Sequence, residues 1–255
     1  MYAILDIETT GGQFNEEGIT EIAIYKFDGH EVVDQFISLI NPEIPIQPFV
    51  VKLTGINNAM LRSAPKFYEV AKRIIEITQD CIIVAHNASF DYRILRTEFR
   101  RLGYDFNSNT ICTVELSKKL IPDQPSYSLG KLVRSLGIPI ADRHRATGDA
   151  MATVKLFKML LAKDVKKEII TSFVKKEIKT GISRNYWTSW KRFPPKPVSI
   201  IFTAKTEPLF ISAKAKTSKN ALTSTLQEPR EKQNEYSRKF LRLLLKKPET
   251  NWLRC

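Results

Sequence analysis

Apolar and polar residues alternate in a way that predicts a meander of strands at the start of the chain. Three apolar segments have the pattern of strands, at residues 2–8, 19–27 and 32–40. The polar turn DGHE joins the last two. The proline-rich segment from Pro42 to Pro48 predicts a loop, and the apolar residues 81–87 predict a fourth strand.

Helical spacing follows these strands. In residues 64–78 one face collects four apolar side chains, Phe67, Val70, Ile74 and Ile77. Further helices are predicted at residues 88–103, where Gly103 ends the pattern, and at 127–138 and 146–164. A meander followed by strands that alternate with helices predicts an α/β sandwich with a mixed sheet flanked by helices.

The pattern decays beyond about residue 165. Residues 165–179 carry alternating Lys and Glu and could prolong the preceding helix, so we interpret 166–183 as a helical linker. Residues 184–255 hold several prolines and no sustained period, apart from a helical pattern at 235–247. We therefore predict a domain over 1–165, the linker, and a largely irregular basic tail (residues 184–255).

Charge separates the two parts of the chain. The net charge is +13, but residues 166–255 contain 21 Lys and Arg, 7 Glu and no Asp, which leaves the first part close to neutral. Neither a long apolar run nor a secretory signal is present, so we expect no membrane span. The odd set of three cysteines, Cys81, Cys112 and Cys255, lacks metal-ligand spacing and fits a reducing cytoplasm.

Four carboxylates stand out by their positions. Asp6 and Glu8 lie two residues apart in a strand, so both side chains project from the same face. Asp91 falls in the first turns of a helix, and Asp149 lies in the last helix, five residues after His144. Taken singly, each has a simpler explanation, which is a structural salt bridge, an acid that favours the helix dipole, or a solvated charge.

Taken together, the four carboxylates predict a metal centre. Hard oxygen ligands suit Mg²⁺ or Mn²⁺. Two such ions can bind both the attacking water and the leaving oxygen of a phosphodiester. His144, beside the last ligand, is then placed as a general base, because an imidazole titrates near neutral pH.

The segments DIETTGG, HNASFD and HRATGDA resemble the three exonuclease motifs of the DnaQ-like superfamily, in its DEDDh class. The resemblance covers about residues 1–165. It implies a ribonuclease H-like fold and metal-dependent 3′→5′ hydrolysis that releases nucleoside monophosphates. It also implies that the 3′-terminal nucleotide is held by six residues, Thr9, Thr10, Leu53, Thr54, Gly55 and Ile56. Asn87 and Phe90 are expected to orient and pack Asp91.

The resemblance leaves several functions open. The first is a DNA exonuclease for proofreading or repair, similar to the epsilon subunit of DNA polymerase III, with a single-stranded 3′ end and a polymerase as partners. The nearest alternative is an exonuclease that trims RNA. From a different class, the chain could be a non-catalytic module that binds nucleic acid or a polymerase, although such a role needs no converging metal-site residues.

The basic tail has an unusual explanation in its codons. Back-translated residues 191–228, read from the third base of each codon, permit the segments GVYYF and YIGKSKN, which resemble the GIY-YIG nuclease module. We therefore predict that a frameshift near Ser183 replaced a second nuclease domain, and that residues 184–255 are largely disordered. The rival interpretation is a basic arm that binds nucleic acid.

Overall fold

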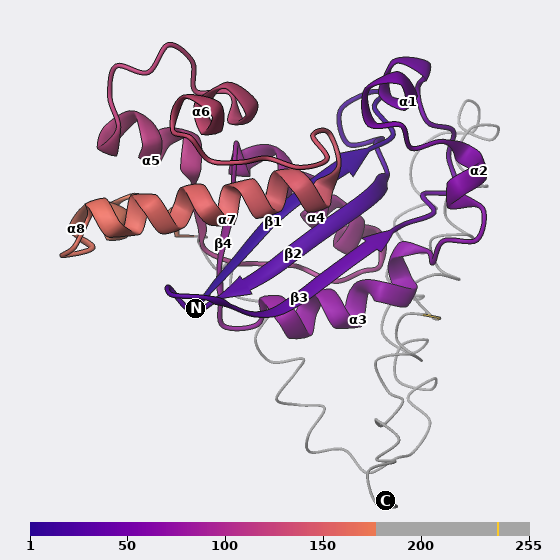
Figure 1. Cartoon of the computed structure of the whole chain (residues 1–255). Helices are drawn as coiled ribbons and strands as arrows, with labels where there is room; N and C mark the ends of the chain where they lie inside the picture. The colour runs from indigo at the N-terminus through magenta and orange to yellow at the C-terminus, as the bar shows by residue number, and fades with distance from the viewer. Residues whose placement is uncertain (177–238, 240–255) are drawn as a thin grey trace, which may run out of the picture. The chain divides into compact units, whose positions relative to one another are not determined.

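The computed structural model describes residues 1–176 and Lys239, and its centre is a five-stranded sheet (Figure 1). The strands are β1 (Tyr2–Thr9), β2 (Ile19–Phe27), β3 (Val32–Leu39), β4 (Ile82–Ala85) and β5 (Thr110–Cys112). They lie in the order β3-β2-β1-β4-β5. The first three strands pair antiparallel, whereas β4 runs parallel to both β1 and β5. The predicted mixed sheet is confirmed.

Helices cover both faces of this sheet. They are α1 (Pro48–Thr54), α2 (Asn58–Leu61), α3 (Phe67–Thr78), α4 (Ala88–Arg101), α5 (Thr113–Leu120), α6 (Leu129–Ser135), α7 (Ala146–Lys163) and α8 (Glu168–Ser172). Helices α3 and α4 contribute to the apolar cluster on one face, and α5, α6 and α7 contribute to the cluster on the other. Figure 1 shows α7 running along the sheet over β1 and β2.

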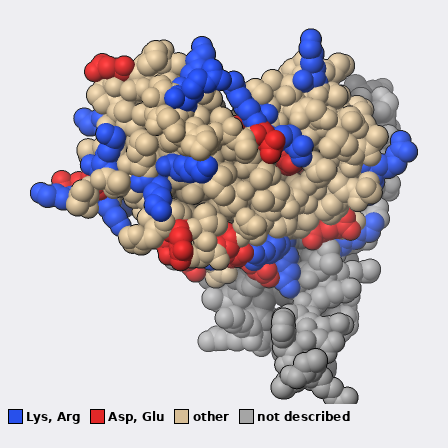
Figure 2. Space-filling model, viewed as in Figure 1, with Lys and Arg blue, Asp and Glu red and all other residues tan. Residues whose placement is uncertain are grey.

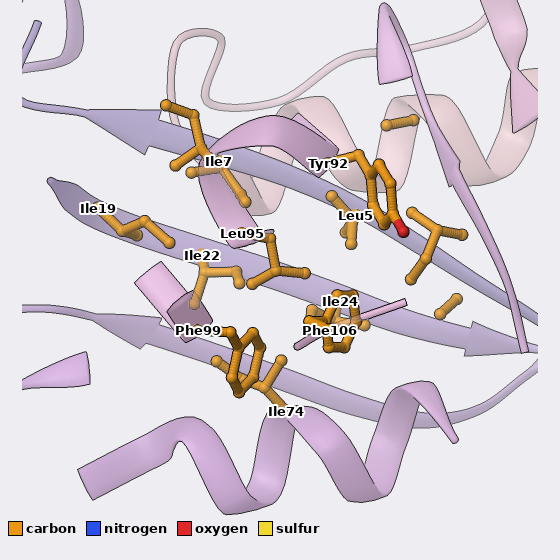
Figure 3. Packing of buried hydrophobic residues seen from close by; sticks show 14 of the residues in the cluster. Leu5, Ile7, Ile19, Ile22, Ile24, Ile74, Tyr92, Leu95, Phe99 and Phe106 are labelled. Carbon is orange, nitrogen blue, oxygen red and sulfur yellow. The ribbon is translucent and has the colours of Figure 1, made fainter. Parts of the chain in front are cut away.

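The alternation of side chains along β1 assigns its residues to the two layers. Leu5 and Ile7 belong to the cluster that includes α3 and α4, where Figure 3 shows Leu5, Ile7, Leu95 and Phe99 packed together. Ile4 belongs to the opposite cluster with the residues of α7. Because side chains alternate with a period of two, Asp6 and Glu8 face the same layer as Ile4. The strand therefore directs both carboxylates toward α7.

Several elements were not predicted. Helices α1, α2 and α5 are short, and β5 has only three residues, so none is long enough to show a period. The predicted prolongation of the last helix is wrong. Helix α7 ends at Lys163, and Asp164 accepts a hydrogen bond of 2.7 Å from the amide of Ile170, which lies within the separate short helix α8. Beyond it, Lys175 pairs with Thr110 at the sheet edge.

The domain boundaries and the tail stay predictions. Apart from Lys239, which is helical, residues from 177 onward lie outside the described part of the chain, including the helix predicted at 235–247 and the segment assigned to a frameshift. In the part that is described, no helix is both long enough and apolar enough to cross a membrane. Cys81 and Cys112 are buried free thiols.

Candidate active site

Three of the predicted carboxylates converge at one end of β1. Asp6 and Glu8 project from this strand toward α7, and Asp149 lies in the first turn of that helix. One oxygen from each residue can be chosen so that all three lie within 4.8 Å of one another. The prediction that Asp6 and Glu8 share a face with Asp149 nearby is therefore confirmed by the geometry.

Asp91 reaches the same strand from the α4 layer. It lies in the first turn of α4 and is 4% exposed. Its Oδ1 accepts a hydrogen bond of 3.1 Å from the backbone amide of Ile7. The pairing of β1 with β4 ends at Ile4 and Val84, so β4 does not take up the Ile7 amide. Asp91 is not in the trio above, but its charge acts on Asp6.

Burial and mutual repulsion make these carboxylates hard to ionise. Burial raises the pKa of Asp6, and repulsion from Asp91, Asp149 and Glu8 raises that pKa further. Burial, together with Asp149 and Glu21, raises the pKa of Glu8 to about 7, although Arg145 opposes this. Burial raises the pKa of Asp91 to about 8, although the amide bond from Ile7 opposes the shift.

The donor set fits a divalent cation. Clustered carboxylates that repel one another are stabilised by a positive charge among them, and all-oxygen ligands are those that Mg²⁺ and Mn²⁺ prefer. Figure 2 shows acidic side chains, flanked by Lys and Arg, between the part of the surface that carries α5 and α6 and the part that carries α1. The cluster of Asp6, Glu8 and Asp149 could therefore hold a metal ion.

His144 lies directly beside the cluster. Its backbone has a left-handed conformation with φ of 63°, and its amide donates a hydrogen bond of 3.1 Å to Oδ2 of Asp149. The side chain of His144 is partly buried. Burial raises the pKa of Asp149, and the hydrogen bond from the His144 amide opposes this shift. The predicted role of the imidazole as a general base stays a prediction.

An ion pair between a buried carboxylate and a partly exposed arginine, which the sequence did not indicate, holds this loop. Glu21 on β2 accepts hydrogen bonds from Nε and Nη2 of Arg145, at 3.0 and 2.6 Å, and a third of 2.8 Å from the amide of Ala146. Glu21 is 2% exposed and lies opposite Glu8 in the sheet. A carboxylate in the apolar segment 19–27 is the same signal that drew attention to Asp6, and it could have identified Glu21.

The loop after β1 packs directly on α1. Thr10 is fully buried, its amide donates to the carbonyl of Gly18, and its carbonyl accepts from the amide of Gln47. Gly11 has φ of 68°, and a Cβ there would lie 2.9 Å from Val50. These backbone bonds make Thr10 an anchor of the loop. Contact of Thr9 and Thr10 with a nucleotide stays a prediction.

The segment predicted as a substrate-binding loop is instead the end of α1. Leu53 is 52% exposed and Gly55 is exposed, with a left-handed φ of 73° that ends the helix. The Thr54 hydroxyl donates to the carbonyl of Val50, and Ile56 is fully buried. Leu53 and Gly55 can therefore face a ligand, whereas Thr54 and Ile56 hold the turn in place.

The two residues expected to support Asp91 lie at the surface. Asn87 is exposed with φ of 78°, and its side chain accepts a hydrogen bond of 3.2 Å from Ser89. Phe90 is 36% exposed. The backbone bond from Ile7 fixes Asp91, so a supporting role for Asn87 and Phe90 stays a prediction.

Comparison with known proteins identifies the family. Residues 3–157 match the model of the family described as Exonuclease (RNase T). The chain belongs to the exonuclease family. The predicted relationship to DnaQ-like exonucleases, the ribonuclease H-like fold and the class of enzyme are thereby confirmed.

Relatives of this exonuclease domain include much longer proteins. DNA polymerase III PolC-type from Caldanaerobacter subterraneus subsp. tengcongensis is 36% identical over 162 residues, which are 64% of this chain and 12% of that protein. The 3′-5′ exonuclease DinG from Staphylococcus aureus (strain USA300) is 32% identical over 202 residues, or 77% of this chain and 22% of the relative. The chain therefore spans less than a quarter of either protein.

A solved structure of similar size also matches the exonuclease domain. Exonuclease X in complex with 5′ overhanging duplex DNA is 29% identical, with a TM-score of 0.53. The match covers 65% of this chain and 93% of the exonuclease X chain. The likeness extends over nearly the whole of that smaller protein.

Proposed function

We propose that this chain is a metal-dependent 3′→5′ exonuclease that hydrolyses phosphodiester bonds of DNA and releases nucleoside 5′-monophosphates. The observation that carries the proposal is the convergence of Asp6, Glu8 and Asp149 within 4.8 Å, with Asp91 fixed beside the same strand. These four carboxylates would hold two Mg²⁺ or Mn²⁺ ions. Such ions, when bound, supply Lewis acidity toward the phosphate and the attacking water.

The residues of the chain would divide the remaining work. His144 takes a proton from the attacking water at a ring nitrogen, as its place beside Asp149 suggests. Leu53 and Gly55, which are exposed at the end of α1, contact the terminal nucleotide together with Thr9. The Glu21–Arg145 pair keeps the His144 loop in position.

The choice of DNA rests on the relatives. Two carry the names DNA polymerase III PolC-type and 3′-5′ exonuclease DinG, and a solved relative was studied with DNA. A single-stranded 3′ end of DNA is therefore the proposed substrate, and a DNA polymerase is a proposed partner. We expect the protein to act in the cytoplasm, in replication or repair.

The test is release of monophosphates from a 3′-labelled oligonucleotide in the presence of Mn²⁺ or Mg²⁺. We expect EDTA and Asp149→Ala to abolish it. His144→Ala should lower kcat by about 10²- to 10⁴-fold, the usual contribution of a general base, with less effect on metal binding. Activity that persists in EDTA would reject the metal-dependent mechanism. Comparing single-stranded DNA, mismatched duplex and RNA decides the substrate, and a preference for RNA would overturn the choice of DNA.

A further inference from the structure

The loop that follows β1 displays an aromatic ring at the surface. Phe14 is 72% exposed, although its loop is held firmly on α4. Arg93 of α4 donates to both carboxylate oxygens of Glu17, at 2.9 and 3.1 Å. Thr97 and Arg101, also from α4, donate to the side chain and the carbonyl of Asn15. These contacts hold the loop while leaving the Phe14 ring in solvent.

Arg93 lies over this ring and over a second one. Its guanidinium carbon lies 4.2 Å from the centroid of the Phe14 ring and 5.4 Å from that of Phe90. Phe90 directly precedes Asp91, which faces β1. Two partly or largely exposed rings and one guanidinium group therefore lie together at α4, the helix whose first turn carries Asp91. Such flat groups provide stacking surfaces for nucleobases.

A groove that Phe14 helps to line runs along α4. Its volume is about 470 Å³, and its lining includes Phe14, Ser89, Arg93, Arg96, Arg100 and Lys175. The four α4 residues among these recur every three or four positions, so they share one face of the helix. They span about 16 Å at 1.5 Å per residue.

Two cations of the groove pair with acids that are partly exposed to solvent. Arg96 lies 3.7 Å from Asp105, and Lys175 lies 2.8 Å from Glu115. Solvent-exposed pairs of this kind contribute little to stability, so phosphate oxygens can replace the carboxylates. Arg100 is exposed at the far end of the groove. The groove thus combines aromatic rings with arginine and lysine side chains, as single-strand binding sites do.

We infer that this groove binds the nucleic-acid strand on the 5′ side of the scissile phosphodiester. The Phe14 ring stacks on a base of that strand, and Arg96 and Arg100 contact its phosphates. The inference rests on the proposed function, because the strand is defined by its 3′ end in the metal site. Residues of α4 then serve two purposes, since Asp91 faces inward to the metal site and the groove residues face outward.

Substrate length provides the test. The kcat/KM value is measured for a single strand of about 15 nucleotides, a length that fills a single-strand site, and for the p-nitrophenyl ester of thymidine 5′-monophosphate, which has no upstream strand. The ratio of the first value to the second should fall about tenfold for Phe14→Ala, since one base stack is lost. Phe14→Trp should keep the wild-type ratio, because it retains an aromatic ring at this position. Arg100→Glu should lower the same ratio, whereas Arg134→Glu, at an exposed arginine of α6, is the matched control.

The outcomes separate the two proposals. An unchanged ratio in both Phe14→Ala and Arg100→Glu would overturn the groove while leaving the exonuclease function intact. A wild-type chain that hydrolyses neither substrate would overturn the proposed function itself. If the variants lose activity only on a duplex with a recessed 3′ end, the groove holds the complementary strand, and its assignment to the degraded strand is wrong.

Discussion

Arg145 and Glu21 are joined by two hydrogen bonds of 3.0 and 2.6 Å, although 124 residues separate them in the chain. Arg145 directly follows His144, and Glu21 sits on the strand next to β1. The pair therefore fixes the loop that carries the proposed base to the sheet that carries Asp6 and Glu8. Because Glu21 is buried, its charge has a large desolvation cost that Arg145 offsets.

Breaking this pair should disturb both stability and turnover. Arg145→Ala leaves the buried Glu21 charge with the Ala146 amide but without its partly exposed guanidinium partner, which should lower the free energy of unfolding by about 1–3 kcal/mol. Turnover should fall at least about tenfold, since small misplacements of catalytic groups are costly. Chemical denaturation and kcat on an oligonucleotide measure the two effects.

Glu21→Gln removes the charge of the pair from its other side and should also lower both quantities. Its matched control is Glu31→Gln, because Glu31 is an exposed acid in the turn after β2. Glu31→Gln should change neither quantity. If Glu21→Gln kept wild-type turnover and stability, the pair would not position the loop.

Metal binding should release protons near neutral pH. The pKa of Glu8 is raised to about 7 and that of Asp91 to about 8 in the metal-free protein, so both are partly protonated there. Metal ligation requires the ionised forms. The apparent affinity for Mn²⁺ should therefore weaken as the pH falls from about 8 to 6.

Calorimetric titration of Mn²⁺ in buffers with different ionisation enthalpies measures the number of protons released. We expect proton release at pH 7 that decreases by pH 9, where both carboxylates are ionised. Binding without any dependence on buffer at pH 7 would contradict the raised pKa values.

Asp91→Asn should stabilise the metal-free protein in mildly alkaline solution. The folded pKa of Asp91 is raised above its unfolded value, so its contribution to stability is present at low pH and is lost as the pH rises toward about 8. Asparagine can still accept the Ile7 amide bond through its side-chain oxygen without carrying a charge. The free energy of unfolding at pH 8.5 should rise by about 1–3 kcal/mol.

Activity should be lost in the same variant, because the amide is a poor substitute for a carboxylate ligand. Denaturation in EDTA, compared at pH 5 and pH 8.5, provides the measurement. A stability gain that is equal at both pH values would show that ionisation of Asp91 is not the cause.

His86 should make the fold sensitive to acid. Its Nε2 lies 2.8 Å from the carbonyl of Tyr127 and therefore carries the proton of the neutral ring, and Nδ1 lies 2.9 Å from the hydroxyl of Thr113. Burial lowers the pKa of His86 below its usual value of 6.5. Its stabilising contribution is thus present above about pH 6.5 and is lost as the pH falls.

Substitution of this histidine should flatten the pH dependence of stability. The difference in unfolding free energy between wild type and His86→Gln should shrink as the pH falls from 7 to 5. His30→Gln, at an exposed histidine, is the matched control. Parallel stability curves for wild type and His86→Gln would contradict this prediction.

The sequence by itself determined the sheet meander, the long helices and the pairing of Asp6 with Glu8 on one face. These features follow from local periods, because side chains alternate along a strand and recur every three or four residues along a helix. It also indicated Asp91, Asp149 and His144, because their motifs share the order and spacing of a family. Short elements such as β5 and α1 were missed, since three to seven residues hold too little of a period.

Only the tertiary structure decided which of these residues meet. The pairing of β2 with β1 places Glu21 opposite Glu8, and α7 then brings Arg145 to Glu21, a contact between distant segments that no local pattern contains. Burial separated the exposed residues Leu53 and Gly55 from the buried residues Thr54 and Ile56. Proximity and burial depend on the packing of all elements at once, and that is why they cannot be found in any one segment of the sequence.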